Sequence, residues 1–327
     1  MEIKRIFQDI QEPGYFVVDW MLHDKCTYDC SYCPPHNKLG NDDWLNLDVL
    51  DEFCNNLEQH VKQLNPDYRI HALFTGGEPT VWKDFGTLVE RLKDRGWYIS
   101  VNSNGSRTKR WWEEYAQHFD SITLSYHTES VNDDEFIEKV KICEKYTRTS
   151  VNVMLNPNTA YFNKAIQFSH RVKQETTNAI IVHHSIQHVF GKLTIGVPFY
   201  TNDQKEIIAT LENKYPNVFE IYKDVMIDNY YIETVDNQIV KLNGLELINQ
   251  KKVNFENWSC SIGLESIFID AKGYILRGTC RAGEKMGTIL KSASIKWAMD
   301  PIICPFSWCG CITDIMNSKE NLQLTRS

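Results

Sequence analysis

The chain has 327 residues, of which 42% are hydrophobic and 24% are charged. These proportions are typical of a folded globular protein and exclude an intrinsically disordered one. The formal net charge of −8 argues against a protein whose main task is to bind nucleic acid phosphates. No apolar run is long enough for a transmembrane helix, and the first residues lack the pattern of a secretory signal. We therefore expect a cytoplasmic protein with no membrane partner and no nucleic-acid partner.

Short apolar runs alternate with amphipathic segments through the first two hundred residues. The predicted strands span residues 15–22, 69–74, 97–101, 122–126, 150–155 and 179–186. The predicted helices between them span residues 48–64, 85–92, 109–119, 133–146 and 161–172. Six strand-and-helix steps in one direction imply a parallel sheet with helices on its outside. Six units are too few for a closed eight-stranded barrel, so we predict an α/β fold, a partial (β/α)6 barrel.

The alternation ends near residue 195, and two hairpins are predicted beyond it. One spans residues 230–242 around Asp236-Asn237, and the other spans 266–277 around Asp270-Ala271-Lys272-Gly273. We therefore predict two domains, an α/β core over residues 1–195 and a smaller, cysteine-rich α+β domain over residues 196–327. In the first domain the working residues should lie at the carboxyl ends of the strands.

Ten cysteines are an unusual number for a chain of this kind. The chain is large enough to bury its own core and has no export signal, so reduced thiols that bind metal are the leading interpretation. Cys54 and Cys143 lie on the apolar faces of predicted helices and are expected in the core. The other eight fall into two groups: Cys26, Cys30 and Cys33, and then Cys260, Cys280, Cys304, Cys309 and Cys311.

The first group follows directly after the first predicted strand. A four-coordinate zinc site would need a fourth ligand there, which His23 or His36 could supply. A [4Fe–4S] cluster is normally held by four cysteines, so three cysteines would leave one iron open to bind another molecule.

This C-x3-C-x2-C spacing, with Tyr32 before the last cysteine, resembles the motif of the radical S-adenosylmethionine (SAM) superfamily. The resemblance implies that Cys26, Cys30 and Cys33 hold a [4Fe–4S] cluster whose open iron binds SAM. It further implies that reductive cleavage of SAM gives a 5′-deoxyadenosyl radical, which removes a hydrogen atom from the substrate. A reducing partner such as flavodoxin or ferredoxin would supply the electron.

Further motifs along the chain extend this resemblance. Thr75-Gly76-Gly77-Glu78-Pro79 ends the second strand, at the place of the family's GGE motif, and glycine lets the backbone come close to a ligand. The resemblance implies that this stretch holds the amino group of the SAM methionine, with Glu78 nearest its charge. Asn102 and Asn104 end the third strand, where family members contact the ribose or the methionine portion. Other residues expected near the pocket are Tyr32, Ser125, His127, Asn152 and Met154. Tight turns could also account for the glycines and the asparagines.

The second group of cysteines indicates another metal site. Cys260 and Cys280 flank the hairpin at 266–277, so we expect both at its open end. Four of the five cysteines would complete a [4Fe–4S] cluster without an open iron. The layout resembles the Twitch or SPASM extensions that follow many radical SAM domains and carry auxiliary clusters. We favour Cys260, Cys280 and Cys311 as ligands, with Cys304 or Cys309 as the fourth. Four thiolates would also bind a structural zinc ion.

The resemblance predicts a radical SAM enzyme of the oxidoreductase or isomerase type that uses an auxiliary cluster for electron transfer. The first cysteine motif begins at residue 26, which leaves no room for a peptide-recognition domain before it. We therefore expect a small-molecule substrate, such as a sugar derivative, that is oxidised or epimerised. One alternative is a peptide-modifying enzyme, a RiPP maturase or an anaerobic maturase. Another is a non-catalytic scaffold that binds zinc or an iron–sulfur cluster. No single side chain is identified as catalytic.

Overall fold

The computed structural model describes residues 2–8, 14–186, 200–214, 230–241 and 244–324. The chain divides into two compact units, each assembled from separate stretches of sequence. The first unit contains residues 1–22, 44–73 and 222–327, and the second contains residues 23–43 and 74–221. These units do not coincide with the predicted domains over 1–195 and 196–327. The predicted boundary near residue 195 lies outside the described residues.

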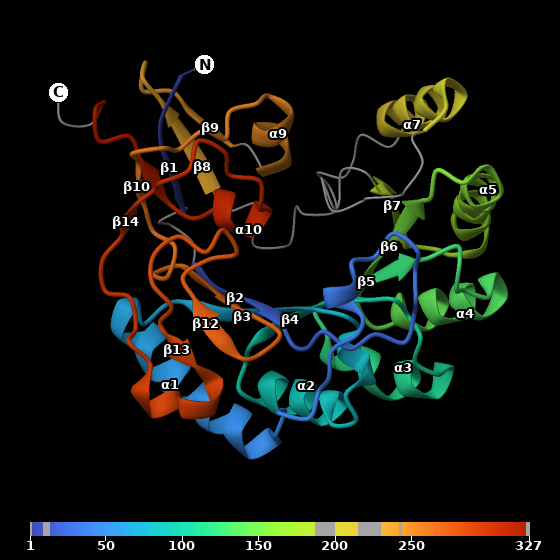
Figure 1. Cartoon of the computed structure of the whole chain (residues 1–327), viewed down its shortest axis with the longest axis horizontal. Helices are drawn as coiled ribbons and strands as arrows, with labels where there is room; N and C mark the ends of the chain where they lie inside the picture. The colour runs from blue at the N-terminus through green and yellow to red at the C-terminus, as the bar shows by residue number, and fades with distance from the viewer. Residues whose placement is uncertain (1, 9–13, 187–199, 215–229, 242–243, 325–327) are drawn as a thin grey trace. The chain divides into compact units, whose positions relative to one another are not determined.

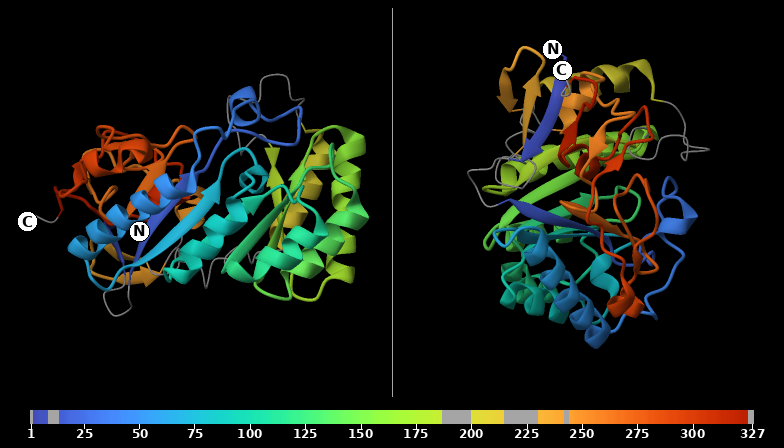
Figure 2. Two further views of the ribbon diagram at one scale, coloured as in Figure 1. Left: turned by 90° about the horizontal axis from the view of Figure 1, so that it is seen from below. Right: turned by 90° about the vertical axis from the view of Figure 1, so that its left-hand side faces the viewer.

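The second unit contains four parallel strands that are joined by helices. The strands pair in the order β4 (Tyr98–Ser103), β5 (Ser121–Tyr126), β6 (Arg148–Leu155) and β7 (Ile180–Ser185). The helices are α2 (Phe85–Asp94), α3 (Lys109–Tyr115), α4 (Asp133–Cys143), α5 (Thr159–Glu175) and α7 (Asn202–Lys214). Figures 1 and 2 show α2 to α5 gathered on one side of these strands. The carboxyl ends of the parallel strands therefore meet at one edge of the sheet.

Polar caps start the helices α4 and α5, and aromatic contacts pack them against the strands. Asn132 and Asn158 cap α4 and α5, because their side chains accept backbone N–H groups of the first helical turn. On the buried side, Tyr126 of β5 stacks on Phe168 of α5 with 3.6 Å between ring centroids. Phe136 of α4 meets Tyr126 edge to face at 5.5 Å. These aromatic side chains fix both helices against the strands.

In the first unit, β2 (Tyr15–Met21) lies between β3 (Arg69–Thr75) and β11 (Ser266–Ile269). β11 runs parallel to β2, and the antiparallel strands β12 (Tyr274–Leu276) and β13 (Gly287–Thr288) continue from it. The predicted hairpin at 266–277 is thus confirmed, with Gly273 at a φ of 74° in its turn. Helix α1 (Leu47–Leu64) is capped by Asn46, and its Asn56 donates to Ser292 Oγ at 3.0 Å.

A second sheet of the first unit joins strands from the two ends of the chain. Its order is β14 (Ile302–Ile303), β10 (Ser259–Cys260), β15 (Lys319–Glu320), β1 (Ile3–Gln8), β8 (Tyr230–Thr234) and β9 (Ile239–Lys241). The predicted hairpin at 230–242 is confirmed as β8 and β9, with Asn237 at a φ of 60°, a conformation that asparagine tolerates. The short helices α9 (Gly244–Asn249) and α10 (Ile312–Ile315) belong to the same unit.

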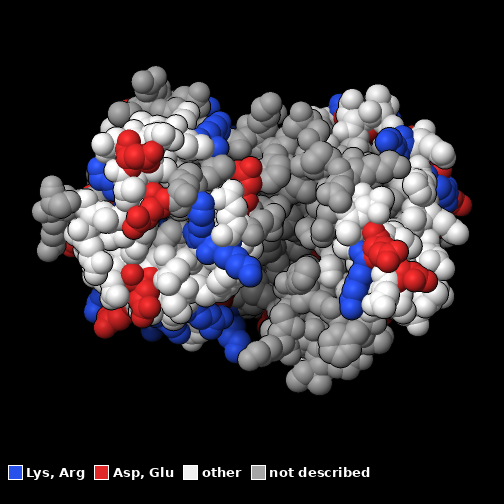
Figure 3. All heavy atoms as spheres, turned by 90° about the horizontal axis from the view of Figure 1, so that it is seen from above, with Lys and Arg blue, Asp and Glu red and all other residues white. Residues whose placement is uncertain are grey.

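The prediction of an α/β fold with a parallel sheet and outer helices is confirmed, and no closed barrel is formed by the described residues. Within those residues, no helix combines the length and the apolar character that crossing a membrane requires. Acidic and basic side chains are interspersed on the face seen in Figure 3.

Candidate functional site

The three cysteines of the first group line one cavity of about 230 Å³ in the second unit. We call this the first cavity. Its wall also contains residues at the carboxyl ends of β3, β4 and β5 and just beyond them, as expected for a parallel sheet. The structure brings together most of the predicted cofactor residues there: Tyr32, Thr75, Gly76, Gly77, Asn102, Asn104 and Ser125, together with His127. Tyr28, Asn37 and Ser103 also line it and were not predicted.

The backbone after β3 is hydrogen-bonded to the loop that leads to the first cysteine. Gly77 N donates to His23 O and Glu78 N donates to Lys25 O, both at 2.8 Å. A Cβ atom at Gly76 would lie 2.3 Å from His23 O, and one at Gly77 would lie 2.2 Å from Lys25 O. Glycine is therefore required at both positions by the chain's own backbone, in addition to any ligand in the cavity.

Glu78 was predicted to lie nearest the charge of the SAM amino group, but the structure places it outside the lining of the first cavity. Its side chain is fully buried. The carboxylate accepts Ser103 Oγ–H at 2.8 Å, Thr80 Oγ–H at 2.6 Å and the backbone N–H of Asn104. Burial raises the pKa of Glu78, and these hydrogen bonds oppose that rise. Glu78 therefore ties the residues that follow β3 to the end of β4.

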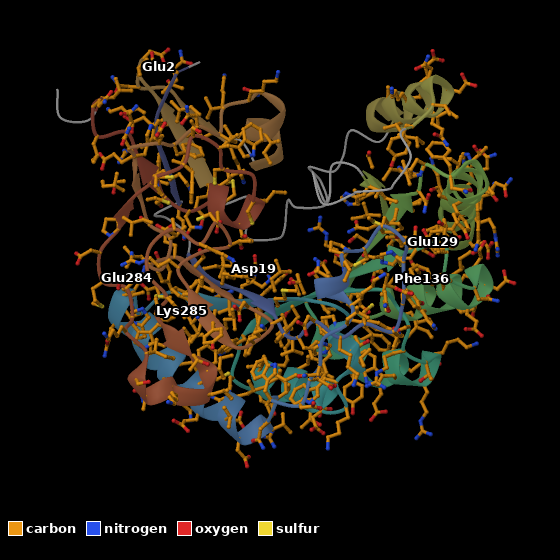
Figure 4. The ribbon with its side chains drawn as sticks, in the orientation of Figure 1. Glu2, Asp19, Glu129, Phe136, Glu284 and Lys285 are labelled. Atoms are coloured by element: carbon orange, nitrogen blue, oxygen red, sulfur yellow. The ribbon has the colours of Figure 1, made fainter. Side chains whose placement is uncertain are left out.

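Two side chains outside the predicted set, Glu129 and Lys38, hold the cysteine loop. Glu129, in the loop after β5 (Figure 4), accepts the backbone N–H and the hydroxyl of Ser31, each at 2.8 Å. The same carboxylate accepts Asn156 Nδ2 after β6. Lys38 Nζ donates to Cys30 O at 3.1 Å. The loop that carries the three thiols is thus attached to two strand ends of the second unit.

The remaining predicted residues divide between the cavity wall and its surroundings. The rings of Tyr32 and His127 stack at 6.0 Å and share a hydrogen bond between the Tyr32 hydroxyl and His127 Nδ1. Burial lowers the pKa of His127 to about 4, so its ring is neutral at pH 7. Asn152 is paired with Ser125 across β5 and β6 but does not line the first cavity. Met154 packs in a buried cluster with Tyr32.

The thiols of the first cavity lie in an environment that favours their neutral form until a cation is bound. Burial raises the pKa of Cys26 and Cys33, and it raises that of Cys30 to about 12. Asn104 Nδ2 lies 3.5 Å from Cys26 Sγ, where its N–H can stabilise a thiolate. A bound iron atom would itself lower the pKa of each thiol. Three soft sulfur donors on one cavity are a donor set that fits an iron–sulfur cluster.

Four of the five cysteines in the second group also meet at one place. Cys260, Cys280, Cys304 and Cys309 line a cavity in the first unit that we call the second cavity. Burial raises the pKa of Cys309 to about 12, and that of Cys280 still further. The cavity measures about 20 Å³, so the side chains around it must move apart to admit four irons. Its donor set is four thiols that form no disulfide, three of them buried and Cys280 half-buried, and this is the set that a fully ligated cluster needs.

Cys311 lies outside the second cavity, in contrast to the predicted ligand set. It is the N-cap residue of α10, and its sulfur lies 2.9 Å from Thr313 Oγ1 in the first turn of that helix. Thr313 Oγ1 in turn donates to the Asp19 carboxylate at 3.0 Å. The sequence spacing could not separate Cys311 from Cys309, because only Gly310 lies between them. In the structure Cys309 lines the second cavity, whereas Cys311 stands at the start of α10.

The other side chains weighed for metal binding lie elsewhere. Cys54 and Cys143 are fully buried in the helices α1 and α4, as predicted. His23 is buried, and its Nδ1 accepts the backbone N–H of Lys25 at 3.2 Å, while the side chain of His36 lies outside the described residues. No three Cys, His, Asp or Glu side chains of the described ranges converge closely enough to hold one metal ion. A zinc ion needs such convergence, whereas the thiolates of a cubane each bind a different iron.

Comparison with protein families finds a match for the segment around the first cavity. Residues 20–156, less than half of the chain, match the model of the radical SAM superfamily. This segment contains all three cysteines of the first group and extends through the GGE stretch to the end of β6.

Comparison with curated proteins finds enzymes that are similar to about a third of the chain. A 7-carboxy-7-deazaguanine synthase from Bacteroides thetaiotaomicron is 27% identical over 109 residues, which are 32% of this chain and 53% of that protein. An S-adenosylmethionine-dependent nucleotide dehydratase from Selenomonas ruminantium is 32% identical over 93 residues, 28% of this chain and 30% of that protein. The match therefore spans about half or less of these relatives.

Comparison with solved structures extends further along the chain. The crystal structure of SuiB from Streptococcus suis bound to the precursor peptide SuiA covers 88% of this chain and 65% of its own, with a TM-score of 0.50 and 13% sequence identity. A structure of SuiB bound to S-adenosylmethionine gives a TM-score of 0.50 with 14% identity, over 84% of this chain and 63% of its own. At this level of identity the likeness concerns the fold alone.

Proposed function

From the match of residues 20–156 to the radical SAM superfamily, we propose that the protein is an enzyme that cleaves SAM reductively. The observation that carries the proposal is that Cys26, Cys30 and Cys33 line the same cavity as Gly76 and Gly77. Thiols for a cluster and a backbone that a ligand can approach closely therefore share one wall of the second unit.

The residues of the first cavity have different roles in the proposed site. Cys26, Cys30 and Cys33 would hold a [4Fe–4S] cluster, and the backbone at Gly76-Gly77 would bind the methionine portion of SAM. When bound, cluster and SAM together supply the 5′-deoxyadenosyl radical that removes a hydrogen atom from the substrate. Asn104 stabilises the Cys26 thiolate through its amide, at 3.5 Å. Asn102 and Ser125 offer polar groups to the cofactor from the ends of β4 and β5.

A second, auxiliary [4Fe–4S] cluster is part of the proposal. Its ligands would be Cys260, Cys280, Cys304 and Cys309, the four thiols on the second cavity. Cys311 is left out of this set, because it faces Thr313 instead. An auxiliary cluster without an open iron suits electron transfer, and the electron would come from a reduced flavodoxin or ferredoxin. All ten cysteines are free thiols, which fits the reducing cytoplasm.

For the substrate we favour a small molecule that is oxidised or isomerised. The curated relatives that support this are named for a deazaguanine and a nucleotide, both small molecules. A sugar derivative remains within this class. A peptide substrate is the second candidate, because the fold of SuiB, which was solved with its precursor peptide, covers most of this chain.

The first test is whether the protein cleaves SAM. Purified protein would be loaded with iron and sulfide without oxygen, reduced with dithionite, and mixed with SAM. We expect 5′-deoxyadenosine, measured by liquid chromatography and mass spectrometry, and we expect none from a triple alanine variant of Cys26, Cys30 and Cys33. Cys143→Ala is the matched control, because it removes a buried thiol of α4 and should retain cleavage.

Metal analysis of the same preparations tests the two clusters separately. We expect about eight irons per wild-type chain and about four in the triple variant. Cys311→Ala should keep all eight, whereas Cys304→Ala should lose part of the auxiliary iron. An iron-loaded, reduced protein that leaves SAM intact would contradict the enzymatic proposal. Zinc in place of iron would favour the scaffold interpretation.

A further inference from the structure

Lys319 is a buried cationic side chain that directly faces the thiols of the second cavity. Its residue is 3% exposed, although lysine is seldom buried so completely. β15 pairs antiparallel with β10, and Lys319 is the direct partner of Cys260 in that register. Directly opposed residues on antiparallel strands project to the same face of the sheet. Lys319 accordingly lines the second cavity together with the four cysteines.

The surroundings of the Lys319 amine fit the charged form. Nζ donates to three backbone carbonyls, those of Asp314, Ile315 at 2.9 Å and Asn317 at 3.0 Å. Three simultaneous donations require the three N–H groups of an ammonium. The same group lies 5.2 Å from the centroid of the Phe255 ring, within the range of a cation–π contact. The positive charge is therefore held at a fixed place by the end of α10.

A fixed charge at this place acts on whatever the four thiols bind. Asp314 places a carboxylate on the same cavity, where it accepts the backbone N–H groups of Thr279 and Cys280. The effect of Lys319 must therefore be measured with Asp314 kept in place.

We propose that Lys319 raises the reduction potential of the auxiliary cluster held by Cys260, Cys280, Cys304 and Cys309. The inference rests on the proposed auxiliary cluster. When that cluster takes up one electron from its reductant, its net charge becomes more negative by one unit. A nearby buried positive charge stabilises the reduced form more than the oxidised form, because the interior screens charges weakly. Lys319 is thus a positioning residue, one that sets how readily the cluster accepts an electron.

The test compares Lys319→Gln with Lys319→Arg. Both changes are made in the triple alanine variant of Cys26, Cys30 and Cys33, so that the auxiliary cluster is the one observed. Gln removes the charge but still offers N–H donors to the carbonyls, whereas Arg keeps the charge. Reduction is followed by electron paramagnetic resonance at set potentials. We expect Lys319→Gln to weaken reduction about tenfold, a drop of about 59 mV for one electron, and Lys319→Arg to stay near the parent protein.

The outcomes distinguish failure of the role of Lys319 from failure of the proposed auxiliary cluster. If the parent variant binds no iron, the auxiliary cluster itself is refuted. If Lys319→Gln keeps its iron and its potential is unchanged, the cluster stands and the role of Lys319 is refuted. If the Gln variant loses its cluster while the Arg variant keeps its cluster and potential, the requirement for a positive charge is supported. If both variants lose it, Lys319 has only a structural role and the inference fails.

Discussion

Asp19 is a partly buried carboxylate on β2, in the first unit (Figure 4). It accepts hydrogen bonds from Thr279 Oγ1 and Thr313 Oγ1, both at 3.0 Å. Burial nevertheless dominates and raises the pKa of Asp19 to about 6, from the ordinary 3.8. Asp19 therefore changes its charge near neutral pH, beside a free thiol at Cys311.

This shift predicts a particular pH dependence of stability. Between pH 4 and 6 the unfolded chain releases the Asp19 proton while the folded chain retains it, so the free energy of unfolding falls as the pH rises. The loss is complete above pH 6 and amounts to at most about 3 kcal/mol. Asp19→Asn cannot ionise, so we expect it to be more stable than wild type at pH 7.5, with the advantage vanishing near pH 4.

Thermal unfolding followed by circular dichroism at both pH values would measure the difference between the two proteins. Asp43→Asn is the matched control, because the same change is made at an exposed carboxylate and should alter stability little. An Asp19→Asn variant whose advantage is equal at both pH values would contradict the raised pKa.

At the scale of elements, the stretch after β3 is joined to the start of the cysteine loop by two backbone hydrogen bonds, from Gly77 to His23 and from Glu78 to Lys25. We expect Gly77→Ala to break this joint, since the new Cβ would lie 2.2 Å from Lys25 O. The two hydrogen bonds and the displaced backbone should cost about 2–3 kcal/mol of stability. SAM cleavage should fall in proportion to the iron lost, which metal analysis and the 5′-deoxyadenosine assay would measure together.

Gly96→Ala is the control for this change. Gly96 has open space around it, and only its φ of 81° opposes a side chain, at a cost of about 1 kcal/mol. It should therefore retain iron and activity. A Gly77→Ala protein with full iron content and wild-type stability would show that the joint is dispensable.

The long elements could be predicted from the sequence, because each is strongly periodic and clearly bounded. Helix α1 begins after the cap Asn46, and the hairpin of β8 and β9 turns at Asn237. The sheet that contains β1 could not be predicted, because β10, β14 and β15 have two residues each and show no periodicity. Their pairing depends on contacts between distant parts of the chain.

Some residues of the candidate sites could likewise be predicted from the sequence, and others could not. The thiols and glycines could be predicted because their spacing along the chain reflects their chemistry. Glu129 binds Ser31 across 98 residues, and Lys319 faces Cys260 from a different strand, so neither has a local signal. Cys309 and Cys311 have equivalent sequence signals, and only the start of α10 separates their roles.

At the scale of the whole molecule, the order of segments along the chain has a consequence for biosynthesis. β1 pairs with β8 on one side and with β15 on the other. At about 5–20 residues per second, a ribosome produces residue 320 about 15–60 s after residue 8. We therefore expect ribosome-stalled chains that end before Lys319 to expose β1 to protease, and chains with both strands outside the ribosome to protect it. Equal cleavage in both would contradict this order.

The two groups of thiols consequently mature at different moments. Every residue on the wall of the first cavity has been synthesised by His127, so that pocket can receive iron while translation continues. The second cavity also needs Lys319, which is synthesised long after His127, so it can form only at a later stage of translation. If both groups of thiols hold clusters as we propose, the iron-delivery machinery of the cell would act on this protein at two separate stages.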